Sequence, residues 1–161
     1  MRIKNKEITT YLNDHLAGSI AAVALLEDLI ERYSGQPLES FFVELRREVK
    51  ADQDLLRKLL GDAEEKESFV RKFLAWMAAK LAGTKFNFAG EEIGGVGLVQ
   101  AFETLSMGIR GKQLLWRALA TCNWTALRDV DLARLEQRAI EQQERVEEER
   151  LSIAREAFAN P

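Results

Sequence analysis

The sequence predicts an all-α protein, a four-helix bundle made of two helical hairpins with a short extra helix in the crossover between them. Three observations predict this fold class. Proline occurs only at Pro37 and Pro161, which leaves nearly all of the chain free to be helical. No segment alternates apolar and polar residues with a period of two, as a half-buried strand does. Apolar residues instead recur at three- and four-residue steps in long segments separated by turn signals.

Two apolar stripes predict the first hairpin. The first stripe indicates a helix over about 7–33, and Ser34-Gly35-Gln36-Pro37 ends it with a helix stop and a turn. The second stripe, which begins at Phe41, indicates a helix over about 38–60. Because the connection is short, we expect these helices to be antiparallel neighbours.

A crossover follows the break at Gly61-Asp62. A short apolar pattern predicts a helix over about 64–81, and a glycine-rich stretch over 83–97 is the one long irregular segment that we expect. The short helix carries the densest aromatic group of the chain, Phe69, Phe73 and Trp76. An apolar helix face of this kind usually belongs to the core, and the alternative is a contact surface for a partner or a second copy.

The second hairpin is predicted from helices over about 98–121 and 127–159, with a turn at Thr121-Cys122-Asn123-Trp124. The last helix is polar for most of its length and rich in opposite charges three and four residues apart, which is typical of a solvated face. Its thin apolar stripe suits a helix that lies on a bundle or reaches past it to a second copy.

The composition limits the classes of function that the chain can have. A chain of 161 residues, 47% hydrophobic and 30% charged, suits a single helical-bundle domain over 1–161. The net charge of −3 gives no reason to expect nucleic acid or an anionic membrane as a partner. The N-terminus has no apolar stretch typical of a signal peptide, and no apolar run is long enough for a membrane span, so we expect a cytoplasmic protein. One histidine excludes any site that needs two imidazoles.

Four segments carry a family resemblance: Tyr11–Ser19, Gly108–Lys112, Trp116–Leu119 and Gln142–Ala154. With the order hairpin, crossover, hairpin, they resemble the ferritin-like superfamily and, more narrowly, a poorly characterised bacterial ferritin-like family that lacks the di-iron histidines. None of the segments is a catalytic signature, so the resemblance implies the fold rather than a chemistry.

Ferritin-like di-metal sites take one glutamate from each of two helices and a Glu-x-x-His motif from each of the other two. In this chain Ala51 and Glu144 stand where the two histidines are needed. The carboxylates that remain at seam or stripe-edge positions are Glu27, Glu48, Asp52, Glu103 and Glu144. Oxygen ligands alone hold hard cations such as magnesium, calcium or manganese, so an all-carboxylate metal site stays open as an alternative.

The favoured interpretation of these carboxylates is a layer of ion pairs. We expect Glu27 and Asp52 to pair across the bundle with cations drawn from a small set, Arg46, Arg47, Arg110 or Lys112. Structural roles are expected for two other polar residues. His15, beside Asp14, is expected to pack or to cap a helix, and Cys122 to be a small, partly buried residue.

The sequence therefore predicts a protein without catalytic residues or a bound cofactor, acting through protein–protein contact or self-association. Phe69, Phe73 and Trp76 are the residues expected to meet a second copy or another protein. The first alternative is the metal-binding bundle with its all-carboxylate site. A weaker one is a small-molecule pocket lined by Trp76, Phe102 and Trp116.

Overall fold

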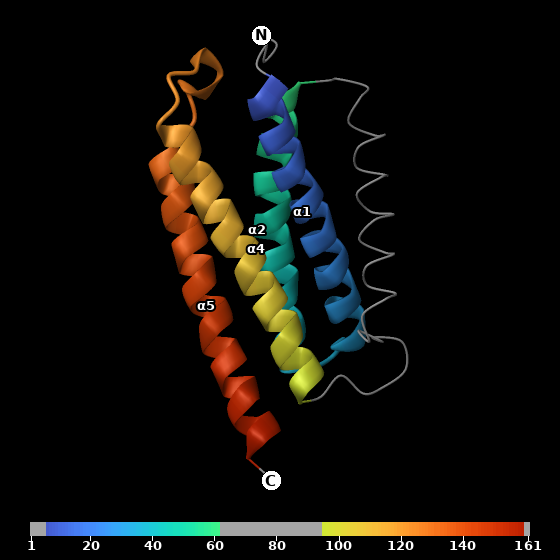
Figure 1. The fold of residues 1–161 in the computed structure, drawn as a ribbon. Helices are drawn as coiled ribbons and strands as arrows, with labels where there is room; N and C mark the ends of the chain where they lie inside the picture. The colour runs from blue at the N-terminus through green and yellow to red at the C-terminus, as the bar shows by residue number, and fades with distance from the viewer. Residues whose placement is uncertain (1–5, 62–94, 160–161) are drawn as a thin grey trace. The chain divides into compact units, whose positions relative to one another are not determined.

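The computed structural model describes residues 6–61 and 95–159, and within these ranges the chain forms four α-helices, one 3-10 turn and no strand (Figure 1). The all-α prediction is confirmed for this part of the chain. The expected short helix over 64–81 lies outside the described residues, and so do its aromatic residues Phe69, Phe73 and Trp76.

The first hairpin consists of α1 (Lys6–Arg32) and α2 (Pro37–Leu60). Backbone hydrogen bonds from Tyr33 N to the Leu29 carbonyl and from Gln36 N to the Tyr33 carbonyl, both 3.0 Å, shape the turn between them. Gly35 takes a φ of 76°, a left-handed conformation that favours glycine. Pro37 then opens α2, where its missing N–H costs no hydrogen bond. The predicted turn and the antiparallel pairing are both observed.

Apolar side chains from both helices form the buried side of this hairpin. Tyr33 and Phe42 contact each other with ring centroids 5.8 Å apart, which joins the turn to the start of α2. The buried apolar residues of α1 and α2 include Leu12, Leu16, Leu26, Leu29, Phe42, Leu45 and Leu56. Neighbours within this set, such as Leu12 and Leu16 or Leu26 and Leu29, are three or four residues apart, which is the spacing of a helix that buries one side.

The second hairpin consists of α4 (Val96–Ala120), a 3-10 turn η1 (Thr125–Leu127) and α5 (Leu132–Phe158). Phe102, Ile109 and Trp116 lie seven residues apart on the buried side of α4. The buried positions of α5 are fewer, Ala139, Gln142, Val146 and Ile153. Figure 1 shows α4 and α5 side by side along their length.

The start of α5 differs from the prediction. The sequence places it near 127, whereas the helix begins at Leu132. Leu127 is buried, so it contributes to the apolar pattern, but it does so from the 3-10 turn. The side chain of Asp131 accepts a hydrogen bond of 2.9 Å from Arg134 N and caps the helix at its true start.

The described residues divide into two compact units, 6–61 and 95–159, each a helical hairpin with its own buried side. Within these ranges no helix combines the length and the apolar character required to cross a lipid bilayer.

Candidate functional site

Glu27 on α1 faces two cations of α2. Its Oε1 lies 3.5 Å from Lys50 Nζ and 3.9 Å from Arg46 Nη1. The predicted ion pair with Arg46 is confirmed. Lys50 was not predicted, although it follows Arg46 by one helical turn and therefore shares its face of α2. The Glu27 side chain is 49% exposed, so it sits at the edge of the seam and the pair contributes at most about 1 kcal/mol.

Asp52 and Gln53 are the buried polar residues of α2, with exposed fractions of 2% and 4%. Gln53 Nε2 donates a hydrogen bond of 3.1 Å to Ser19 Oγ, and that hydroxyl donates to the carbonyl of Leu16. The chain of contacts joins α2 to α1 and satisfies a buried amide. Gln53 was missed at the sequence level, although it lies on the apolar stripe, four residues after Val49.

Polar side chains also connect α4 to α5. Lys112 Nζ donates to Oε1 of Gln142, whose side chain is fully buried. Six residues earlier on α4, Ser106 Oγ accepts a hydrogen bond from Gln143 Nε2. A layer of side chains that must all match fixes the register of two helices, which is the role predicted for the ion-pair layer. The side chains of this layer belong to a lysine, a serine and two glutamines rather than to carboxylates.

Two arginines complete the connection between α4 and α5. Arg117 Nε donates to Glu136 Oε1 at 2.8 Å, and this hydrogen bond lowers the pKa of Glu136. Arg150 pairs with Glu147 at 2.7 Å within α5, which lowers the pKa of Glu147, and reaches Glu103 on α4 at 3.6 Å. Glu103, a candidate metal ligand, therefore faces a cation.

The remaining candidate carboxylates are placed separately. Glu48 on α2 is partly buried, and Glu144 on α5 is exposed at the rim of a shallow hollow. Within residues 6–61 and 95–159, no group of three or more His, Cys, Asp or Glu side chains is placed to hold a metal ion. The structure thus brings none of these carboxylates together as a cluster in the part of the chain that it describes.

His15 packs edge-on against Tyr11, with ring centroids 4.7 Å apart and an interplanar angle of 80°. Burial lowers the pKa of His15, and the neighbouring Asp14 acts weakly in the opposite direction. The predicted packing role of this histidine is observed.

Cys122 is exposed, not partly buried as the sequence suggested. It follows the end of α4, and its Sγ lies 3.7 Å from the carbonyl of Ala118.

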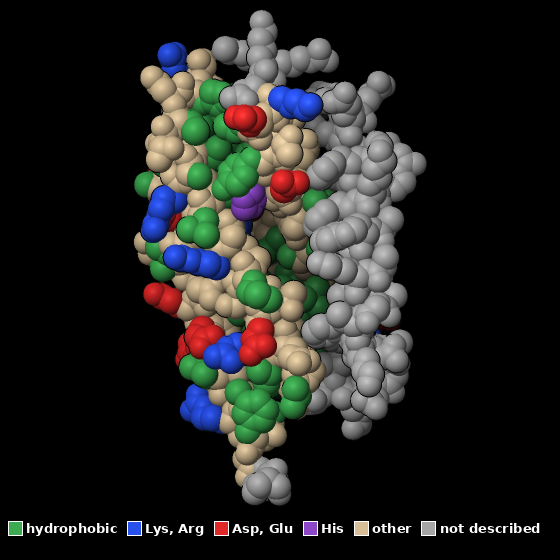
Figure 2. All heavy atoms as spheres, viewed as in Figure 1, with side chains coloured by type: hydrophobic (Ala, Val, Ile, Leu, Met, Phe, Trp, Pro, Cys, Tyr) green, Lys and Arg blue, Asp and Glu red, His purple; other side chains and the backbone are tan. Residues whose placement is uncertain are grey.

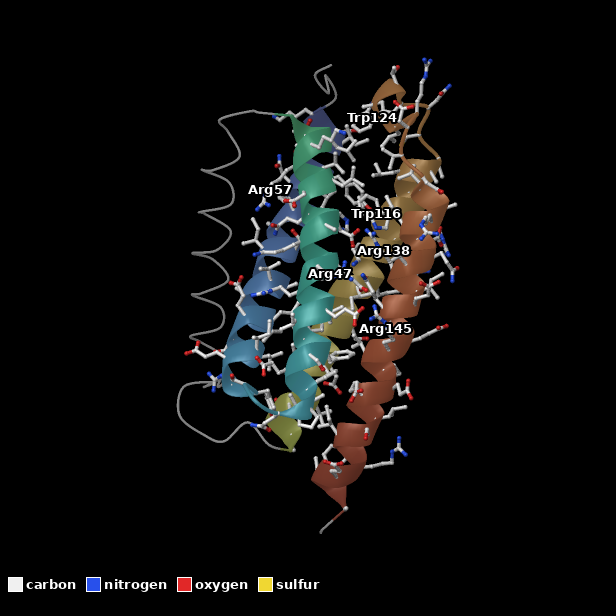
Figure 3. The ribbon with its side chains drawn as sticks, turned by 180° about the vertical axis from the view of Figure 1, so that it is seen from behind. Arg47, Arg57, Trp116, Trp124, Arg138 and Arg145 are labelled. Atoms are coloured by element: carbon white, nitrogen blue, oxygen red, sulfur yellow. The ribbon has the colours of Figure 1, made fainter. Side chains whose placement is uncertain are left out.

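Trp116 and Phe102 of α4 are fully buried. Figure 3 labels the Trp116 side chain on α4. Trp116 Nε1 has no hydrogen-bond partner among the described residues. Trp76, which shared the predicted small-molecule pocket with these two side chains, lies outside the described ranges. The hollows found on α5 are surface features lined by residues such as Leu151 and Arg155.

Several large apolar side chains are exposed. Met107 and Leu114 on α4 are exposed by 69% and 46% of their surface. Val96 on α4 and Phe158 on α5 are more than half exposed. Figure 2 shows hydrophobic side chains at the surface along the path that α4 takes in Figure 1, among charged side chains of both signs. A contiguous exposed apolar patch is typical of a contact surface, whereas single exposed apolar side chains are common on any protein.

Comparison with known proteins assigns no family to this geometry. No protein-family model, no curated protein and no solved structure matches the chain.

Proposed function

We propose that this chain is a ferritin-like four-helix bundle that acts without catalysis, through contact with another protein or with a second copy of itself. The two hairpins of long helices support the architecture, since ferritin-like bundles consist of two such pairs joined by a crossover. One observation carries the function: large apolar side chains, Met107 and Leu114 above all, lie exposed on a regular helix.

The charged residues support a role without bound metal. Glu27 lies beside Lys50 and Arg46, and Glu103 lies beside Arg150. A carboxylate that faces a cation at these distances is a poor metal ligand, because the metal has to displace that cation. We therefore propose that the chain binds no divalent metal.

Sedimentation velocity of the intact chain over a range of concentrations tests the proposal. The double variant Phe73→Ser with Trp76→Ser tests the contact surface predicted from the sequence. We expect the native chain to show a mass above that of the monomer that rises with concentration, and the variant to lose part of this association. A folded monomer in both samples at every concentration would contradict the self-association.

A further inference from the structure

We draw no further inference here: the strongest candidate, the shallow hollow along the exposed side of α5 lined by Glu144, Glu148, Leu151 and Arg155, carries charges of both signs on a single helix, and nothing in the structure shows what covers it.

Discussion

Among single residues, His15 is one whose burial makes stability depend on pH near neutrality. Burial lowers its pKa in the folded chain below the ordinary value of 6.5. As the pH falls below 6.5, the unfolded chain therefore binds a proton at His15 before the folded chain does, and stability decreases over that window. We expect the urea midpoint of the native chain to fall between about pH 7.5 and pH 5.5 more steeply than that of a His15→Gln variant. Parallel pH profiles for the two proteins would contradict the burial of a neutral His15.

Gly111 is a second residue whose effect on the free energy of unfolding can be measured. It lies in the interior of α4, where glycine is less favourable than alanine by about 1 kcal/mol. Its added Cβ would meet nothing within 4 Å, so Gly111→Ala should raise the free energy of unfolding by about that amount. Urea denaturation at low protein concentration, where the chain is monomeric, measures this change. A decrease in stability would show that the position is not open.

Part of the polar chemistry could be predicted residue by residue. The four-and-three spacing around Glu27 placed it on the seam, and its contact with Arg46 is observed. The contact between Gln53 and Ser19 could not be predicted, because a glutamine on an apolar stripe does not indicate which side chain of another helix will accept its hydrogen bond.

Among the elements, α5 depends on a single cap. Asp131 accepts a hydrogen bond from Arg134 N and ends the turn that precedes the helix. Asp131→Ala should lower the free energy of unfolding by about 1 kcal/mol, the usual loss when an N-cap is removed. Asp129→Ala is the matched control, since Asp129 is an exposed aspartate of the same turn just outside the cap position. Equal urea midpoints for the two variants would contradict the capping role.

Helix positions were the most predictable property of the elements. The three- and four-residue spacing of apolar residues, with the turn residues between segments, predicted α1, α2 and α4 where they are observed. This is because each of these helices buries one continuous stripe. The start of α5 could not be placed in the same way. Leu127 is buried from a 3-10 turn, and an apolar residue outside a helix produces the same pattern as one inside it.

At the scale of the whole molecule, we expect no bound metal. Elemental analysis of chain purified without chelator should find no stoichiometric divalent metal, because cations already face Glu27 and Glu103. Glu27→Ala serves as the control and should give the same result. One metal ion per native chain, lost in Glu27→Ala, would contradict this prediction and favour the all-carboxylate site.

Association of the whole chain is a property that the sequence predicts only in outline. Composition and charge favoured a non-catalytic role, but which face of a helix is exposed depends on tertiary packing that periodicity alone does not specify. Met107 and Leu114 therefore emerge from the structure, whereas Phe69, Phe73 and Trp76 remain a prediction from the sequence.

The most direct test is sedimentation velocity of the unmodified chain from about 5 μM to about 500 μM, a range that brackets a weak dissociation constant. We expect a monomer of 18.3 kDa at the lowest concentration and a growing fraction of twice that mass as the concentration rises. A sedimentation profile that stays monomeric over the whole range would contradict this expectation.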